Sequence, residues 1–298
     1  MSAETLLGAR RRLVPANGLV FEVFEAGEGD RLALLLQGFP EHAVVWRDLV
    51  APLVAEGYRV WAVNQRGYGD TSRPKGKDAY SLAALTEDVA ALIAASEATS
   101  VALVGHDWGG FIAWVVAIRR LAPLERLVII NIPHPLCFRE ALKGFGQKLK
   151  SSYTALFQIP VLPDFLLSVG RGFFTGLMIR VAAGRPGAVP PEVMDIYRDN
   201  AAAPGAATAM LDWYRAAGQD LLTASDLAAP IETPTLVVWG MSDIALGEAC
   251  LEGTERYVTD LRIEKLAGVS HFAPEDAPAK VVPLITAFLR GSATGRMG

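Results

Sequence analysis

Cysteines, long apolar runs and long runs of one charge are scarce in this 298-residue chain. Its two cysteines, Cys137 and Cys250, lie far apart, so no disulfide framework is expected and both thiols are predicted to be buried and reduced. No stretch approaches the ~18 uncharged apolar residues of a membrane span. The formal net charge is −4 without any basic block, which argues against a nucleic-acid-binding surface. We therefore expect a soluble protein with no nucleic-acid partner and no membrane partner.

The N-terminal region lacks the features of an export signal. Arg10, Arg11 and Arg12 are followed only by Leu13 and Val14 before a proline, which leaves no room for the apolar segment of such a signal. These residues predict a cytoplasmic protein. The length fits one main α/β domain with an insertion, and a homodimer would be ordinary for a soluble chain of this kind.

Short apolar runs alternate along the chain with longer helical patterns, which is typical of a parallel sheet wrapped by helices. In residues 81–98, for example, Leu82, Leu85 and Val89 recur at helical spacing behind Ser81 as a helix N-cap. Residues 19–24 alternate in character as an antiparallel edge hairpin does. The predicted strands are 31–37, 58–64, 101–105, 126–132, 235–239 and 261–266.

The alternation stops after Pro133 and returns near residue 235. Between them the pattern predicts only helices, over 145–157, 166–183, 191–200 and 206–218, with the alanine- and glycine-rich segment 201–209 linking two of them. The resulting prediction is a core domain of residues 1–133 and 223–298 and a helical cap domain of residues 134–222. The cap would cover the carboxyl edge of the sheet, where ligands bind in such folds. The final residues, 291–298, are predicted to be disordered.

The stretch LVGHDWGG, residues 103–110, places an acid between small residues where a strand gives way to a helix. Gly105 and Gly109 flank Asp107 two residues away on each side, which is the small-x-nucleophile-x-small arrangement of a nucleophile elbow. The helix N-terminus would stabilise the ionised carboxylate, and the amide of Trp108 would be free to donate. Alternatively, Asp107 only caps the helix. Residues elsewhere in the chain must distinguish these two roles.

Further segments resemble those of α/β-hydrolases of the epoxide hydrolase and haloalkane dehalogenase branch, in which Asp replaces the usual Ser. LLLQGFPEHAVVWRDLV resembles the oxyanion-hole segment, VNQRGYGDTSRP the loop after the fourth strand, VVWGMSDIAL the acid loop and LAGVSHFAPEDAP the histidine loop. The resemblance covers nearly the whole chain and implies a mostly parallel eight-stranded sheet with a helical cap. Asp107, Asp243 and His271 follow in the order of nucleophile, acid and histidine that this fold requires.

The resemblance implies a two-step hydrolysis without a metal or an organic cofactor. Asp107 attacks an electrophilic carbon and forms an alkyl ester. His271, held by Asp243, then activates the water that hydrolyses this ester. The amides of Phe39 and Trp108 are the expected oxyanion-hole donors.

Two segments of the predicted cap favour an epoxide as the substrate. SSYTALFQIP and LDWYRAAG resemble the tyrosine-bearing segments of epoxide hydrolases. This assigns to Tyr153 and Tyr214 the donation of hydrogen bonds and a proton to the oxirane oxygen, with a vicinal diol as product. Otherwise both phenols pack in the cap with their hydroxyls reaching solvent. A small lipophilic epoxide fits the expected pocket walls, which are Phe39, Trp108, Leu156, Phe157 and Phe272.

Dehalogenation of a haloalkane or a haloacid with the same nucleophile is the main alternative. Haloalkane dehalogenases usually carry Asn where Phe39 stands, and fluoroacetate dehalogenases usually carry Arg where Trp108 follows the nucleophile. Those enzymes also often place the triad acid where this chain has Asn131, which leaves Asp243 as the acid. A non-catalytic protein that keeps the pocket is a further alternative, and the intact triad disfavours it.

One residue departs from the family pattern. Gln37 stands before the glycine of the oxyanion segment, where the family normally has His. An amide can hold a turn by hydrogen bonds as an imidazole can, so we expect the local geometry to survive. The remaining histidines, His42, His106 and His134, are expected to be structural.

Overall fold

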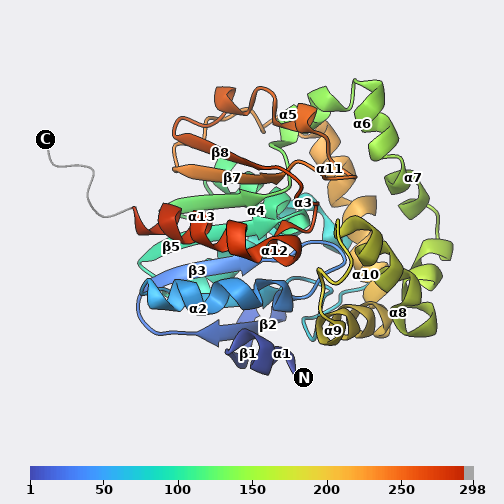
Figure 1. Cartoon of the computed structure of the whole chain (residues 1–298), viewed down its shortest axis with the longest axis horizontal. Coiled ribbons are helices and arrows are strands. Elements are labelled where there is room, and N and C mark those ends of the chain that lie inside the picture. The colour runs from blue at the N-terminus through green and yellow to red at the C-terminus, as the bar shows by residue number, and fades with distance from the viewer. Residues whose placement is uncertain (292–298) are drawn as a thin grey trace, which may run out of the picture.

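The structure is a computed structural model that describes residues 1–291. Its centre is a single sheet in the order β1-β2-β4-β3-β5-β6-β7-β8 (Figure 1). The pairs β1/β2 and β2/β4 are antiparallel and all others are parallel, which confirms the mostly parallel eight-stranded sheet. Residues 292–298 of the tail predicted to be disordered lie outside the described residues. The strands are β1 Arg10–Ala16, β2 Leu19–Ala26, β3 Arg31–Leu36, β4 Arg59–Asn64, β5 Ser100–His106, β6 Arg126–Ile130, β7 Thr235–Gly240 and β8 Leu261–Leu266.

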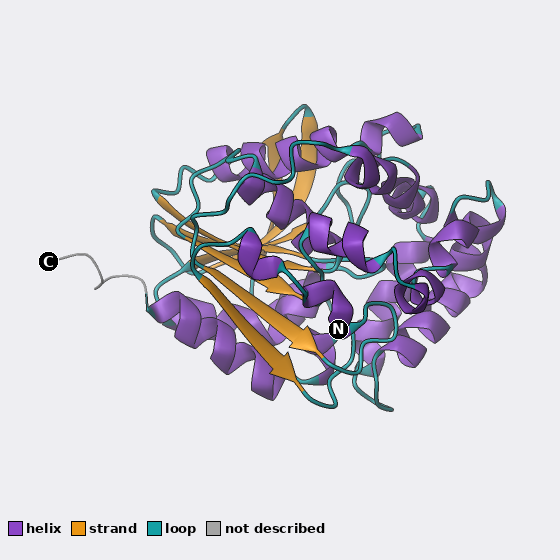
Figure 2. Cartoon of the chain, turned by 90° about the horizontal axis from the view of Figure 1, so that it is seen from above, coloured by secondary structure: helices purple, strands orange, loops and turns teal. Residues whose placement is uncertain are grey.

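Helices cover both faces of the sheet, as the fan of strands between them shows in Figure 2. Strand β3 is apolar from Leu32 to Leu36 because both its faces are buried there. Its Leu34 and Leu36 belong to the cluster that contains residues of α3 and α4, whereas Leu35 packs with residues of α2 and α13 on the other face. The helices outside residues 134–223 are α1 Ala3–Leu7, α2 Arg47–Ala55, α3 Leu82–Ala95, α4 Trp108–Ile118, α12 Ala273–Asp276 and α13 Pro278–Arg290, with short 3-10 turns at Ala43–Trp46, Lys77–Tyr80, Glu248–Leu251 and Thr254–Arg256.

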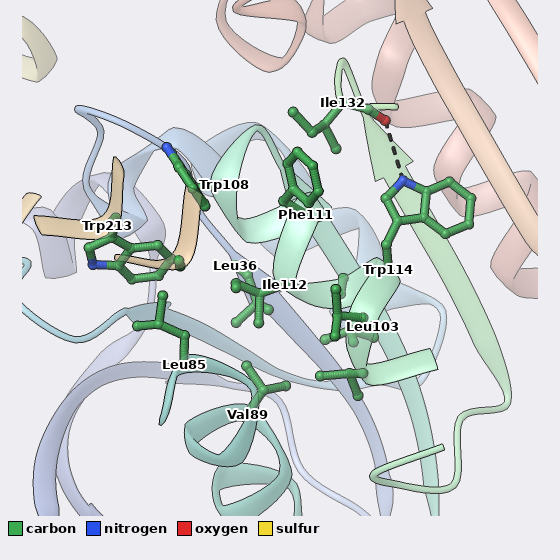
Figure 3. Packing of buried hydrophobic residues seen from close by; sticks show 14 of the residues in the cluster. Leu36, Leu85, Val89, Leu103, Trp108, Phe111, Ile112, Trp114, Ile132 and Trp213 are labelled. Carbon is green, nitrogen blue, oxygen red and sulfur yellow. Dashed lines mark hydrogen bonds between the residues drawn. The ribbon is translucent and has the colours of Figure 1, made fainter. Parts of the chain in front are cut away.

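Helix α4 is buried along its whole length and anchors the strand-to-helix junction that carries Asp107. Figure 3 shows Trp108, Phe111 and Ile112 of this helix among side chains from the sheet and from α3. The indole N–H of Trp114 donates to the carbonyl of Ile132 at 3.4 Å, which ties α4 to the end of β6. The junction is therefore fixed by packing on several sides.

The edge hairpin begins earlier than the sequence predicted, because β1 is a charged strand. Arg11 of β1 pairs with Glu22 of β2 at 2.5 Å, and Arg12 pairs with Glu25. These cross-strand ion pairs stabilise β1 against β2. Strand β1 lacks the apolar alternation from which residues 19–24 were predicted to form a strand. Charged side chains on an edge strand also discourage pairing with another chain.

Residues 134–222, here called the insert, contain helices and no strand in the structure. Their helices are α5 Pro135–Ala141, α6 Phe145–Lys150, α7 Tyr153–Phe157, α8 Leu162–Ala182, α9 Pro191–Ala202, α10 Ala206–Arg215 and α11 Ala217–Thr223. Three details differ from the predictions: 145–157 and 206–218 each divide into two helices, α8 begins four residues early, and 201–209 is helical except at 203–205. Alanine favours helix, so this alanine-rich segment extends α9 and α10 instead of forming a long linker.

Helix α8 is long and apolar enough, by length and composition alone, to cross a membrane. Its backbone leaves helical geometry at residues 169–172, where Gly170, Arg171 and Gly172 have positive φ. Arg171 forms an ion pair with Asp199 of α9. The ion pair fixes α8 against α9 beside the kink. Only 28% of the most apolar 18-residue stretch of α8 is buried. Much of an apolar helix is thus left exposed.

Candidate active site

Asp107 lies at the sharp turn between β5 and α4 with φ 47° and ψ −123°, a conformation that L residues rarely adopt. A Cβ on Gly105 would lie 2.5 Å from the carbonyl oxygen of Gly109, and one on Gly109 would lie 2.2 Å from that of Leu36. Only glycine fits at either position. The Asp107 side chain makes no capping hydrogen bond to α4, so the capping alternative does not describe this residue.

The loops after β5, β7 and β8 bring the three predicted triad residues together. His271 Nδ1 lies 2.7 Å from Asp243 Oδ2, and His271 Nε2 lies 3.4 Å from Asp107 Oδ2. The other oxygen of Asp243 accepts from the amides of Ala245 and Leu246 at 2.7 and 2.9 Å. Asp243 is therefore fixed in one orientation and holds the imidazole between two carboxylates.

The charges of the triad shift one another's pKa values. Burial raises the pKa of Asp107, but the adjacent His271 and the Phe39 amide outweigh it and leave the pKa below its usual value. Burial would lower the pKa of His271, whereas Asp243 and Asp107 together raise it well above its usual value. Asp243 is likewise held ionised, with its pKa lowered by His271 against the effect of burial. These shifts favour a protonated imidazole between two ionised carboxylates in the free protein.

The segment after β3 supplies an amide to the nucleophile. The N–H of Phe39 donates to Asp107 Oδ1 at 2.8 Å, as expected of an oxyanion-hole donor. Gly38 makes this approach possible, because a Cβ there would lie 2.4 Å from the Asp107 Cβ. The amide of Trp108 is in the first turn of α4, where N–H groups have no intrahelical acceptor, and it remains available as the second donor.

The Gln37 side chain holds the oxyanion segment as the sequence predicted for an amide. In the amide orientation that satisfies both its nitrogen and its oxygen, the Gln37 side chain donates to the Val63 carbonyl at 2.7 Å and accepts from the Gln65 amide at 3.3 Å. The Gln65 side chain in turn donates to the Gln37 carbonyl at 2.6 Å. The two glutamines fasten the end of β3 to the end of β4, so the replacement of His by Gln leaves the turn bound.

Two cavities meet at Asp107, Tyr153 and Tyr214, which line both of them. The first, lobe A, has a volume of about 370 Å³ and the second, lobe B, about 480 Å³. Lobe A includes Trp108, and lobe B includes His271. The other predicted walls, Phe39, Leu156, Phe157 and Phe272, all line lobe B. The predicted site residues therefore surround one two-lobed cavity, except Asp243, which lies behind His271 and lines neither lobe.

Both predicted tyrosines line the two lobes together with Asp107. Burial and the charge of Asp107 raise the pKa of Tyr153, and burial, Tyr153 and Asp107 raise that of Tyr214. The two phenols consequently stay protonated at neutral pH and act as donors. The Phe157 ring packs between them, with centroids 5.5 Å from Tyr153 and 5.0 Å from Tyr214. The two phenol groups therefore lie inside the cavity, which differs from the alternative in which their hydroxyls only reach solvent.

Residues 34–278 match the family described as alpha/beta hydrolase fold. The chain belongs to this family. It is 35% identical over 286 residues to the AB hydrolase superfamily protein YfhM of Bacillus subtilis (strain 168), with 95% of this chain and 99% of that protein covered. It is 36% identical to human epoxide hydrolase 4 over 283 residues, which are 92% of this chain and 76% of that one. A solved epoxide hydrolase from a hot-environment metagenome superposes with a TM-score of 0.84 at 32% identity, over 95% of this chain and 99% of the other. The predicted resemblance to the epoxide hydrolase branch is confirmed.

Two buried residues of this α/β-hydrolase were not identified as site residues from the sequence. Glu41 accepts from the amide of Gly38 at 2.8 Å and from His106 Nδ1 at 2.9 Å. His106 Nε2 lies 2.9 Å from the carbonyl oxygen of His271. The pair thus joins the oxyanion segment to the histidine loop. Glu41 and His106 are 65 positions apart, so the sequence does not show that they are in contact. The only sequence signal for this pair is an ionisable side chain in each of the motifs GFPE and GHD.

Asn131 stands where related dehalogenases often have the acid of the triad. In this structure its side chain is hydrogen-bonded to Asp243. Its Nδ2 donates to Asp243 Oδ2 at 2.9 Å, and its Oδ1 accepts from the amide of Gly240 at 3.0 Å. Asn131 also has a positive φ of 46°. This residue positions Asp243 and does not replace it.

The other histidines and both cysteines lie outside the two lobes. His42 accepts from the Val44 amide and lies against Asn64, and burial lowers its pKa to about 4. His134 stacks on Tyr257 at 4.4 Å, and burial lowers its pKa to about 3. Both imidazoles are therefore neutral structural groups. Cys137 and Cys250 are free and buried, as predicted.

Proposed function

We propose that this protein hydrolyses an epoxide to a vicinal diol through an alkyl ester on Asp107. The observation that carries the proposal is the position of Asp107, which lines both lobes together with Tyr153 and Tyr214. A carboxylate faced by two protonated phenols suits a substrate whose carbon is attacked while its oxygen gains negative charge. The similarity to epoxide hydrolases of known structure supports the same reaction.

In the first step Asp107 Oδ2 attacks an oxirane carbon, and the carbon–oxygen bond of the ring breaks. Oδ1 is held by the Phe39 amide, which leaves Oδ2 as the nucleophilic oxygen. One phenol of the pair Tyr153 and Tyr214 gives its proton to the departing oxygen while the other donates a hydrogen bond. The products are a hydroxyalkyl ester of Asp107 and a phenolate.

In the second step the protonated His271 first gives a proton to the phenolate. The neutral imidazole then takes a proton from water, and the oxygen of that water attacks the carbonyl carbon of the ester. The amides of Phe39 and Trp108 stabilise the resulting oxyanion. Collapse of this intermediate passes its hydroxyl proton to the departing alkoxide, which releases the diol with the original Oδ2 and leaves the water oxygen in the Asp107 carboxylate. His271 is left protonated and Asp107 ionised, which restores the starting state.

One turnover in heavy-oxygen water tests the ester. Mass analysis of the Asp107 peptide and of the diol is expected to find the label in Asp107 and not in the product. Label in the diol after a single turnover would mean that water attacked the epoxide directly, with Asp107 as a base. Diol formation measured beside halide release from a matched haloalkane distinguishes the proposed reaction from dehalogenation, which the Phe39 and Trp108 positions already disfavour.

A further inference from the structure

The insert presents an unusually apolar surface to solvent. Of the eighteen large hydrophobic side chains exposed in the described part of the chain, twelve fall within residues 143–185. The most exposed are Phe145 at 81% and Val161 at 75%. Monomeric soluble proteins rarely leave so many large apolar side chains together in water. We call residues 143–185 the apolar face; it comprises α6, α7 and α8, which form the outer edge of the insert in Figure 1.

The mouth of lobe B opens on this apolar face. Four residues of the face both line lobe B and are exposed, namely Leu156, Phe174, Leu177 and Val181, and Tyr153 keeps its phenol group buried in the lobe while the rest of the residue is partly exposed. Exposed Ile244 completes the mouth from the loop after β7. A lipophilic molecule that reaches lobe B thus passes over side chains that are themselves apolar and exposed.

The charge of the apolar face differs in sign from that of the whole chain. Residues 143–185 hold six Lys or Arg and one Asp, whereas the chain has a net charge of −4. The single acid, Asp164, is paired with Arg215, and three of the cations are paired with acids outside the segment, namely Lys143 with Glu140, Arg171 with Asp199 and Arg185 with Asp276. Among the described residues no carboxylate lies within ion-pair distance of Lys148 or Arg180, whereas Lys150 Nζ donates to the carbonyl oxygen of Asp243 at 2.7 Å. Lys148 and Arg180 stand next to exposed Leu149 and Val181 in the sequence, as in a surface that binds anionic lipid.

We propose that the apolar face docks on the surface of an anionic lipid bilayer, so that lobe B opens toward the lipid. Apolar side chains would enter the boundary between headgroups and acyl chains while Lys148 and Arg180 contact the headgroup phosphates. This is a peripheral contact and not a span, because α8 is kinked at 169–172 and tied to α9. It leaves the predicted cytoplasmic location in place and replaces the expectation of no membrane partner.

A second copy of the chain fits this face less well than lipid does. A two-fold interface would place the face against itself and bring its excess of cations together, which is unfavourable. Such an interface would also cover the mouth of lobe B. A bilayer has neither disadvantage, because anionic headgroups complement the cations and the acyl region can hold lipophilic substrate.

The test is sedimentation of the full-length protein with vesicles of phosphatidylcholine alone and of phosphatidylcholine with one quarter phosphatidylglycerol. We expect binding to the anionic vesicles, weakened at least tenfold by 0.5 M salt because the headgroup attraction is screened. The double variant Phe165→Ser/Phe173→Ser removes two exposed rings that do not line either lobe, and it should lower the partition coefficient at least tenfold. The matched control Leu13→Ser/Leu121→Ser removes exposed apolar side chains elsewhere and should bind like the wild type.

Thermal melting of each variant tests whether the fold is intact. Light scattering on a sizing column gives the mass of each variant in solution. Equal binding by the wild type and Phe165→Ser/Phe173→Ser, or no binding to either vesicle, overturns the proposal. A wild-type dimer that this variant converts to monomer overturns it as well, since a second copy would then cover the face. Because sedimentation requires no turnover, its result is independent of whether the protein hydrolyses epoxides.

Discussion

His106 Nε2 lies 2.9 Å from the backbone carbonyl oxygen of His271, while its Nδ1 lies 2.9 Å from a carboxylate oxygen of Glu41. A carbonyl and a carboxylate only accept hydrogen bonds, so both ring nitrogens of His106 carry hydrogen. Burial opposes this charge, but Glu41 raises the pKa of His106 above its usual value. An imidazolium directly before the nucleophile in sequence therefore holds the backbone of the histidine loop.

His106→Ala should lower the free energy of unfolding by about 3–5 kcal/mol, because it leaves the Glu41 carboxylate buried without its cation. Urea denaturation at pH 6 measures the loss. The raised pKa means that this contribution is complete below the unfolded pKa and is lost as pH rises through the folded pKa, so the difference between wild type and variant should narrow at alkaline pH. Glu41→Ala/His106→Ala should recover part of the loss, and a single-variant cost under about 1 kcal/mol would refute the buried ion pair.

Removal of the phenols should slow ring opening. Tyr153→Phe and Tyr214→Phe are each expected to lower kcat/KM for an epoxide about tenfold or more, since one donor remains, and the double variant should lose roughly 10³-fold or more. Steady-state diol formation measures both effects. Tyr257→Phe is the matched control, because Tyr257 stacks on His134 and lines neither lobe. A double variant as active as the wild type would remove the phenols from the mechanism.

His271→Gln should form the ester but not hydrolyse it, because Asp107 attacks without help from a base and the second step requires one. Mass spectrometry of the variant after incubation with an epoxide is expected to show the protein plus one substrate. Asp107→Asn is the control and should stay unmodified. An unmodified His271→Gln protein that still binds substrate would show that attack itself requires the imidazole.

Hydrolysis of the ester should accelerate as pH rises. Asp107 and Asp243 together hold the pKa of His271 well above its usual value, and only the neutral imidazole can accept a proton from water. Esterification removes the charge of Asp107, so the pKa of His271 in the ester should be lower than in the free protein. Single-turnover ester decay measured against pH gives the pKa of His271 in the ester. NMR titration of the imidazole gives the pKa of His271 in the free protein. Equal values would contradict the coupling of Asp107 to His271.

The two lobes should accept the two substituents of an internal epoxide separately. Gly218 lines lobe A, and a Cβ there would meet Trp108 at 3.7 Å, an ordinary contact, so Gly218→Leu can narrow lobe A without strain. Ala182→Leu is the matching change in lobe B. Gly218→Leu is expected to lower kcat/KM at least tenfold for an epoxide substituted on both carbons and to spare a terminal epoxide. Equal losses on both substrates would mean that the lobes do not divide the substrate in this way.

The sequence alone was sufficient for the local features. Gly105 and Gly109 around Asp107 predicted the elbow because only small residues fit that turn, and the apolar runs predicted the parallel strands within a few residues. The order of Asp107, Asp243 and His271 predicted which loops converge, because parallel strands end at one edge of the sheet. The charged strand β1 was missed because its partner strand supplies the carboxylates that make it stable.

Tertiary structure decided everything that depends on contacts between distant segments. The pairing of His106 with Glu41, the support of Asp243 by Asn131 and the two-lobed shape of the cavity arise from side chains far apart in sequence. The exposure of the insert was equally hidden, because an apolar helix such as α8 has the same sequence pattern whether its face is buried or open to solvent. Periodicity specifies which residues share a face of an element, and only packing determines what that face meets.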